Sequence, residues 1–347
     1  MERGFKRMEQ IRLGRTGLMV SRSGFGAIPI QRISFDEAKD LLRKAYDRGI
    51  NFYDTARSYT DSEEKIGYAL ADVRDKIIIA TKSGATDRKT LREHLETSLR
   101  NLNTDYIDIY QLHNPKQLPD PDDEEGLYAE LLEIKAEGKV RFIGITNHRI
   151  DLAIEAVRSG LYDTMQFPLN SLSSERDLSI IDECLKHDVG LIAMKGMSGG
   201  LITNAQSTFA FLRQYPNVVP IWGIQHHWEL EEFLQLEANP PALDEAMWEI
   251  IQKDREELAG SFCRGCGYCL PCPADIEIPM AARMAFLLKR AAYQQYLTDE
   301  WKEKMARIEK CILCGHCRSK CPYDLDTPAL LKKMLDGYRQ FYETHHA

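Results

Sequence analysis

The chain has 347 residues, of which 44% are hydrophobic, so it is long enough to bury one large core or two smaller ones. Its formal net charge of −8 offers no basic surface for nucleic acid or for an anionic membrane. No run of about eighteen apolar residues is present, and the start, MERGFKRMEQIRLGRTG, lacks the apolar stretch and cleavage site of a signal peptide. We therefore expect a soluble, cytoplasmic protein whose partners are small molecules or other proteins.

Short runs rich in β-branched residues alternate with helical patterns over the first two thirds of the chain. Amphipathic stretches such as SFDEAKDLLRKAYDRG and DLAIEAVRSG place Gly49 and Gly160 where helix C-caps are expected. The eight predicted strands start at Met19, Ile50, Lys76, Tyr106, Val140, Tyr162, Val189 and Val218. Eight βα units favour a (β/α)8 TIM barrel over a doubly wound sheet, since no GxGxxG motif follows an early strand.

Two boundaries frame this predicted barrel. Before the first unit, IRLGRTGLMV predicts a hairpin that closes the bottom of the barrel. After the last unit, the paired prolines of QLEANPPALDE interrupt the periodicity before a helical pattern from Ala242 to Leu258. We therefore expect a barrel over residues 1–238 and a mainly α-helical domain over residues 239–347.

Four ionisable residues lie at or near the ends of consecutive predicted strands. Asp54 ends the second strand, Tyr59 follows in the loop, and Lys82 and His113 end the third and fourth strands. The carboxyl ends of barrel strands carry the chemistry, and neighbouring strands lie about 4.8 Å apart, so these groups can converge on one small substrate. They suit carbonyl reduction, in which a hydride reaches the carbon while an acid donates a proton to the oxygen.

Each of these residues has an expected role. Tyr59 is the expected acid, and a neighbouring Lys82 cation would lower its pKa from about 10 toward the working pH. Asp54 would hold Lys82 as an ion pair, and His113 would orient the carbonyl oxygen as a neutral donor. Taken singly, a strand-end lysine or aspartate is more often part of a structural ion pair, and Tyr59 and His113 are also explained by ordinary packing. Their joint occurrence at these strand ends favours the catalytic interpretation.

Three stretches, NFYDTARSYTDSEEKIG, IIIATKSG and YIDIYQLHN, resemble the signature stretches of the aldo-keto reductase family. The resemblance extends from about Ile11 to Leu236. It implies nicotinamide-dependent carbonyl reduction or alcohol oxidation by the four residues named above, acting on a small carbonyl or alcohol substrate.

The same resemblance implies contacts with the nicotinamide ring. Thr146 and Asn147 of GITNH and Gln166 of MQFPLN match the positions that hold the carboxamide, with strand-end capping and buried hydrogen bonding as the alternatives. In LIAMKGMSGGLI, Met194 stands where the family usually has an aromatic residue that stacks on the ring, and Lys195 follows it as a further expected contact.

The cofactor's adenosine end is expected near IWGIQHHWELEEFL. Where the family usually carries Lys or Arg for the 2′-phosphate, this chain offers only His226 and His227 between Gly223 and Glu229. Because histidine is mostly neutral at pH 7, both NADP(H) and NAD(H) remain open. The resemblance also implies a contact between Glu232 and the adenine, with an ordinary helix-surface glutamate as the alternative.

A proline-rich loop, PKQLPDPDDEEG, follows His113 and carries five acidic residues. It either gates the site and selects the substrate or is a solvated acidic loop. Cys184, on the helix after the sixth strand, is expected to be a buried small hydrophobic residue.

The other eight cysteines form two quartets after residue 260. The first is CRGCGYCLPCP, with Cys263, Cys266, Cys269 and Cys272, and the second is CILCGHCRSKCP, with Cys311, Cys314, Cys317 and Cys321. In a chain of this size such crowding indicates reduced thiolates that bind metal rather than disulfides. A CxxCxxC loop can wrap three thiolates around one cubane, while the fourth cysteine of two-cluster ferredoxins binds the other cluster.

This region resembles an α-helical bacterial-ferredoxin-type domain, which implies two [4Fe-4S] clusters. By that analogy one cluster is bound by Cys263, Cys266, Cys269 and Cys321, and the other by Cys311, Cys314, Cys317 and Cys272. The first quartet departs from the pattern by having two rather than three residues before its fourth cysteine. Paired zinc sites are the alternative, although they usually pair two CxxC units across a longer gap. Helices are expected from IEIPMAARMAFLLKRAAYQQY onward, between the quartets.

Three interpretations of the whole chain remain, because a nicotinamide moves electrons in pairs as hydride, each cluster moves one, and no flavin-binding pattern is visible. We favour an oxidoreductase whose barrel chemistry is coupled through the clusters to an external ferredoxin-like protein. The first alternative is an ordinary aldo-keto reductase with structural or redox-sensing clusters. The second is a non-catalytic nicotinamide-binding subunit of a redox complex.

Overall fold

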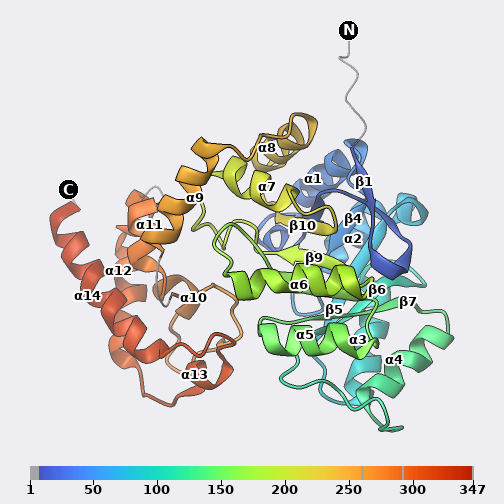
Figure 1. The fold of residues 1–347 in the computed structure, drawn as a ribbon. Coiled ribbons are helices and arrows are strands. Elements are labelled where there is room, and N and C mark those ends of the chain that lie inside the picture. The colour runs from blue at the N-terminus through green and yellow to red at the C-terminus, as the bar shows by residue number, and fades with distance from the viewer. Residues whose placement is uncertain (1–7, 259–261, 291–292, 346–347) are drawn as a thin grey trace. The chain divides into compact units, whose positions relative to one another are not determined.

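The computed structural model describes residues 8–258, 262–290 and 293–345 (Figure 1). It divides into two compact units. The first contains the residues up to Gly196 together with Gln206–Met247, and the second contains Met197–Ala205 together with the residues from Trp248 onward. The described residues do not include residues 1–7 at the start of the chain. They also do not include residues 291 and 292, which belong to the predicted helices between the quartets.

Eight parallel strands close into a barrel in the first unit, which confirms the predicted (β/α)8 TIM barrel. Their order around the barrel is β10-β3-β4-β5-β6-β7-β8-β9. The strands are β3 (Gly24–Gly26), β4 (Phe52–Asp54), β5 (Ile78–Ser83), β6 (Ile107–His113), β7 (Val140–Thr146), β8 (Thr164–Pro168), β9 (Gly190–Met194) and β10 (Val218–Gly223).

Helices alternate with these strands. They are α1 (Phe35–Asp47), α2 (Ser62–Leu70), α3 (Arg88–Asn101), α4 (Leu127–Ala136), α5 (Ile150–Ser159), α6 (Glu175–Lys186), α7 (Ala205–Arg213) and α8 (His227–Ala238). Ser34 and Glu37 form a capping box that fixes the start of α1. The predicted C-terminal glycines are confirmed, since Gly160 caps α5 with φ 75° and Gly49 follows α1 with φ 96°.

An antiparallel hairpin precedes the barrel, as predicted. It pairs β1 (Gln10–Arg12) with β2 (Met19–Ser21). The prediction of one barrel strand from Met19 is wrong, because β2 belongs to the hairpin and the barrel strand β3 begins only at Gly24. Between them the buried Arg22 donates hydrogen bonds to three carbonyl oxygens in the segment 213–216, which fixes the chain where it turns from one sheet to the other.

The hairpin packs against the interior of the barrel. Leu13 and Leu18 share one core cluster with side chains from five barrel strands, namely Phe52, Ile78, Ala80, Ile109, Ile192, Val219 and Ile221. Burying each such side chain contributes about 1.5–3 kcal/mol. At the turn, a Cβ on Gly14 would lie 2.2 Å from the amide nitrogen of Gly190 at the start of β9, so only glycine fits there.

The second unit is built from helices, which confirms the predicted mainly α-helical character of this region. The helices after the barrel are α9 (Glu245–Glu257), α10 (Ile278–Ala281), α11 (Met284–Arg290), α12 (Asp299–Ala306), α13 (His316–Lys320) and α14 (Thr327–His345). Helix α14 packs against α10, α11, α12 and α13, and its buried Tyr338 donates a hydrogen bond to the carbonyl oxygen of Tyr296 at 2.8 Å. No helix in the described part of the chain is long and apolar enough to cross a membrane.

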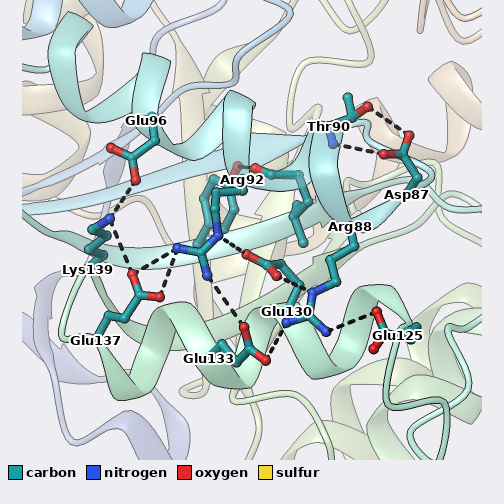
Figure 2. A network of polar contacts seen from close by, with 12 residues as sticks. Asp87, Arg88, Thr90, Arg92, Glu96, Glu125, Glu130, Glu133, Glu137 and Lys139 are labelled. Carbon is teal, nitrogen blue, oxygen red and sulfur yellow. Dashed lines mark hydrogen bonds and ion pairs between the residues drawn. The ribbon is translucent and has the colours of Figure 1, made fainter.

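A network of ion pairs joins α3 to α4 on the outside of the barrel (Figure 2). At its centre is Glu130, which is only 2% exposed and accepts hydrogen bonds from Arg88 Nε at 2.7 Å and Arg92 Nε at 2.5 Å. The carboxylates of Glu133 and Glu137 are more exposed to solvent; Glu133 pairs with both arginines, and Glu137 pairs with Arg92. The buried carboxylate is therefore the group on which the network depends.

We expect Glu130→Ala to lower the free energy of unfolding of the barrel by about 1–3 kcal/mol, because it leaves two arginines without their buried partner. The matched control, Glu133→Ala, removes a half-exposed carboxylate and should change it by less than about 0.5 kcal/mol. Urea denaturation combined with hydrogen exchange of the α3 and α4 amides measures both variants. Equal effects of the two substitutions would contradict the central role of Glu130.

Candidate active site and cysteine centres

The four predicted catalytic residues meet at the carboxyl ends of the barrel strands. Asp54 ends β4, Lys82 lies in β5, His113 ends β6, and Tyr59 follows β4 in its loop. Lys82 Nζ lies 2.6 Å from Asp54 Oδ1 and 5.2 Å from the centroid of the Tyr59 ring. The rings of Tyr59 and His113 pack edge to face, with their centroids 5.9 Å apart.

The Lys82–Asp54 ion pair is buried. Lys82 is 1% exposed and Asp54 is 2% exposed, and Lys82 Nζ also donates a hydrogen bond to the carbonyl oxygen of Thr55 at 2.5 Å. Burial raises the pKa of Asp54 and lowers the pKa of Lys82, and the charge of each residue opposes the shift of the other. The pair therefore holds a cation and its counter-ion together beside the Tyr59 ring.

The protonation of Tyr59 differs from the sequence expectation. Burial, and then the negative charge of Asp54, raise the pKa of Tyr59 above its usual value, whereas Lys82 was expected to lower it. The expectation was wrong because Asp54 largely neutralises the Lys82 charge, so that the cost of burying a phenolate dominates. Tyr59 is accordingly a protonated hydroxyl at neutral pH, the state from which a proton can be donated.

The pKa of His113 shifts in the opposite direction, below its usual value. Burial, with smaller contributions from the charges of Lys82 and Lys195, lowers the pKa of His113 to about 3. The imidazole is therefore neutral near pH 7, as the sequence analysis expected for a residue that donates a hydrogen bond without carrying a charge.

A buried glutamine that the sequence analysis missed connects these residues. The Gln111 amide nitrogen lies 3.3 Å from Asp54 Oδ2 and 3.0 Å from Gln166 Oε1. Gln166 in turn donates to Asp54 Oδ1 at 3.3 Å. The sequence could have indicated Gln111, because it lies two residues before His113 and therefore on the same face of β6. Among the described residues the buried Gln111 Oε1 has no hydrogen-bond partner.

The other two predicted carboxamide contacts are engaged in the loop after β6. Thr146 Oγ1 accepts a hydrogen bond from the amide of Asn114 at 3.1 Å. The Asn147 side chain donates to the carbonyl oxygen of Pro115 at 3.0 Å and accepts from the amide of Arg149 at 2.8 Å. Both residues therefore position the segment that follows His113, whatever contact with a cofactor they also make.

The remaining predicted cofactor residues follow the last two strands. Met194 ends β9, is partly buried and packs against the barrel core, and Lys195 follows it with φ 61°. Gly223 ends β10, and a Cβ there would lie 3.3 Å from Pro29 Cγ. Glu232 lies on α8, where burial and the neighbouring Glu229 raise its pKa. The first three residues thus share the strand-end rim, and Glu232 lies on the helix that follows it.

A cavity of about 630 Å³ opens beside His113. Its walls are the end of β5 with the loop to α3, and the end of β6 with the proline-rich acidic loop. His113 itself is part of the lining, together with Asp87, Lys116, Asp120 and Asp123. Of the four candidate catalytic residues, His113 alone is part of this lining, and the loop after His113 forms one wall of the cavity.

The eight cysteines of the second unit surround two hollows. Cys272, Cys311 and Cys314 line only the first hollow, and Cys263, Cys266 and Cys321 line only the second. Cys269 and Cys317 touch both hollows. Each hollow is thus lined by the first three cysteines of one quartet, by the fourth cysteine of the other, and by one shared cysteine of that other quartet, Cys269 in the first hollow and Cys317 in the second.

Neighbouring cysteines in these hollows influence one another's pKa values. Burial, and then the proximity of Cys263 and Cys266, raise the pKa of Cys269 to about 12, and the neighbours of Cys317 include Cys311 and Cys272. Thiolates gathered in this way need bound cations to stay deprotonated. In the described part of the chain, no three His, Cys, Asp or Glu side chains are grouped closely enough to hold a single metal ion. Five cysteines line each hollow, and a [4Fe-4S] cubane takes four thiolates, so the residues present fit that group.

Two family models match the chain. The model described as "Aldo/keto reductase family" matches residues 22–213, and the model described as "4Fe-4S dicluster domain" matches residues 262–326. The two matches fall on the barrel and on the segment that contains both cysteine quartets. They confirm the two-part architecture expected from the sequence.

Individual relatives agree with the first match. Aldo-keto reductase YhdN of Bacillus subtilis is 30% identical over 215 residues, which cover 56% of this chain and 64% of that protein. The NADH-specific methylglyoxal reductase of Escherichia coli is 30% identical over 226 residues, which cover 56% of this chain and 69% of that protein. The chain thus spans about two thirds of the length of these relatives.

A solved structure shows the same fold. The aldo-keto reductase from Klebsiella pneumoniae in complex with NADPH matches with a TM-score of 0.62 at 21% identity, over 72% of this chain and 95% of that one. Because the family model accounts for more than half of the 347 residues, and the barrel fold and the sequence relatives agree with it, the protein belongs to the aldo/keto reductase family.

Proposed function

We propose that the protein is a nicotinamide-dependent oxidoreductase that interconverts a small carbonyl compound and its alcohol at Tyr59, Lys82, Asp54 and His113. The observation that carries this proposal is the buried Lys82–Asp54 pair, 2.6 Å apart, beside a protonated Tyr59 and a neutral His113 that lines a cavity. A structural ion pair alone requires neither the tyrosine nor the cavity. The combination is what acid-assisted reduction of a carbonyl requires.

The residues divide the chemistry as follows. A bound reduced nicotinamide supplies the hydride to the carbonyl carbon. Tyr59 donates its hydroxyl proton to the carbonyl oxygen as negative charge develops there. Lys82 then stabilises the phenolate that Tyr59 becomes, Asp54 holds Lys82 in place, and neutral His113 donates a hydrogen bond that orients the substrate oxygen. In the direction of alcohol oxidation each proton moves back along the same path.

The cofactor is NADP(H) or NAD(H). Gln166, Thr146 and Asn147 are the proposed contacts with the carboxamide, and Met194, Lys195, Gly223 and Glu232 are the other proposed contacts. The similar proteins do not decide between the two cofactors, since one relative is named NADH-specific and one solved structure is a complex with NADPH. His226 and His227 do not favour a 2′-phosphate as a lysine or arginine would.

The second unit is proposed to bind two [4Fe-4S] clusters. Cys263, Cys266, Cys269 and Cys321 would hold one, and Cys311, Cys314, Cys317 and Cys272 would hold the other. The grouping of thiols around the two hollows supports this exchange of fourth ligands. Reduced thiols are kept in the cytoplasm, which is the compartment we propose. The clusters would pass single electrons between the barrel chemistry and an external ferredoxin-like protein.

A second candidate function is an ordinary aldo-keto reductase whose clusters are structural or sense oxidants. The observation that favours it is that every residue of the barrel site lies in the first unit, so the site is chemically complete without the cysteines. The two functions differ in whether hydride-derived electrons reach the clusters. A non-catalytic nicotinamide-binding subunit is the third possibility, and it requires that Tyr59 be dispensable.

Tyr59→Phe removes only the proposed acid and should lower kcat for methylglyoxal reduction by about 10²–10⁴-fold while cofactor binding is unchanged. Tyr68→Phe is the matched control, because Tyr68 is 52% exposed on α2 and should leave kcat unchanged. Steady-state kinetics with NADH and NADPH, together with fluorescence titration of the cofactor, measures both effects. A Tyr59→Phe variant with full activity would remove the catalytic role and favour the non-catalytic subunit.

The pH profile tests the neutral state of His113. Because its pKa is lowered to about 3, the residue does not titrate between about pH 5.5 and 8, where an unperturbed histidine would. The rate of carbonyl reduction should therefore show no inflection near pH 6.5 that depends on His113. The measurement is kcat/KM against pH for the wild type and for His113→Gln. An inflection in the wild type that disappears in the variant would mean that a charged His113 takes part.

The exchange of fourth ligands can be tested by counting iron. Wild-type protein should hold about eight iron atoms and Cys263→Ala about four. In the Cys263→Ala background, Cys272→Ala should remove the remaining cluster, whereas Cys321→Ala should leave it in place. The reverse result would mean that each quartet holds its own cluster, and stoichiometric zinc without iron would end the cluster proposal. Cys184→Ala, in α6 of the barrel, is the control that should lose no iron.

A further inference from the structure

The two cysteine loops share two left-handed backbone positions but differ in the side chain at one of them. Each CxxC segment has a left-handed residue directly before its second cysteine, Gly265 with φ 64° in the first loop and Leu313 with φ 53° in the second. Each loop also has a left-handed glycine directly after that cysteine, Gly267 and Gly315. The loops are therefore matched, and Leu313 stands where the first loop has glycine.

A left-handed backbone is sterically unfavourable for leucine and carries no such cost for glycine. In the first loop, close packing also requires glycine, because a Cβ on Gly265 would lie 2.9 Å from the guanidinium carbon of the buried Arg283. The second loop carries a strained leucine whose side chain points into open surroundings. Strain kept in this way calls for a functional reason, because a glycine in the same position would remove it.

The side chain of Leu313, whose backbone is strained, is also exposed. Leu313 is 75% exposed and its neighbour Ile312 is 67% exposed, the largest values among the exposed large hydrophobic side chains of the described residues. Both residues line the hollow formed by Cys272, Cys311 and Cys314. We call Ile312 and Leu313 the apolar tip. It exposes apolar surface directly beside a proposed cluster.

Positive charge surrounds the apolar tip in the sequence. Residues 310–320 contain Lys310, Arg318 and Lys320 and no acidic residue, in a chain whose net charge is −8. All three cations are exposed, Lys310 directly before the loop and the other two on α13. An apolar centre with a charged rim is the composition of a transient protein interface, and a basic rim attracts an acidic partner.

We propose that the apolar tip and the cations Lys310, Arg318 and Lys320 form the docking surface for a small acidic one-electron carrier protein. The proposal rests on the proposed cluster bound by Cys272, Cys311, Cys314 and Cys317. Docking here places the carrier against the loop that holds this cluster. One electron then passes from the reduced cluster to the oxidised carrier, so that the cluster is oxidised and the carrier reduced by one electron, with no bond or proton transferred.

The probe is an acidic plant-type [2Fe-2S] ferredoxin, mixed without oxygen with the iron-loaded full chain. Leu313→Gly removes the more exposed side chain of the apolar tip and relieves the backbone strain, so ferredoxin should bind about tenfold more weakly in calorimetry, while the thermal midpoint of the protein stays equal or rises. Leu185→Ala is the matched control, since Leu185 is 62% exposed on α6 and should leave ferredoxin binding unchanged.

The charges are tested separately. Lys310→Glu with Lys320→Glu should slow electron transfer from the dithionite-reduced protein to ferredoxin by about tenfold or more at low salt, and should flatten its dependence on ionic strength. Lys89→Glu with Lys253→Glu reverses two exposed lysines elsewhere and should change neither quantity. Stopped-flow absorbance measures the rates.

Iron content, measured for every variant, separates the possible failures. Binding that is unchanged in Leu313→Gly protein with about eight irons overturns the docking surface and leaves the clusters standing. Protein that never loads iron overturns the proposed clusters and the docking surface together. Self-association that is lost in Leu313→Gly, measured by sedimentation, would assign the apolar tip to a second copy of this chain and also overturn the carrier proposal.

Discussion

The candidate active site depends on one interaction, the buried ion pair between Lys82 and Asp54. Two opposite charges removed from water persist only when each compensates the other and hydrogen bonds satisfy the remaining atoms. The barrel meets this requirement with the Thr55 carbonyl and with the amides of Gln111 and Gln166. Loss of either charged partner would leave an uncompensated charge inside the barrel, so the pair that we propose for catalysis also constrains the fold around it.

The second unit obeys a related constraint with a different solution. Its thiols gather around two hollows, and burial raises the pKa values of Cys263, Cys269 and Cys317, so bound metal favours the thiolate forms of these three. Binding of iron and ordering of the two loops are therefore expected to be coupled. Gly265 and Leu313 occupy equivalent left-handed positions in those loops. The loop with Gly265 packs against Arg283, whereas the loop with Leu313 exposes apolar side chains to solvent.

Periodicity was enough to predict the barrel, because parallel strands that are buried on both faces leave runs such as KIIIATKSG in the sequence. It failed at Arg22, where two short strands of different sheets follow each other and only long-range hydrogen bonds separate them. The strand-end residues were predicted because motif and strand position coincide. The pKa direction of Tyr59 and the role of Gln111 were not, because both depend on how burial and neighbouring charges combine in three dimensions.

The central claim is that electrons delivered as hydride in the barrel reach the clusters of the second unit. Anaerobic titration of the iron-loaded protein with NADH and then NADPH, followed by cluster absorption and EPR, tests it most directly. The account predicts bleaching of the cluster absorption and a reduced-cluster EPR signal, complete near one cofactor per chain, because one hydride carries one electron for each of two clusters. A cofactor that binds while the clusters stay oxidised would contradict the coupling and leave a carbonyl reductase with structural or sensing clusters.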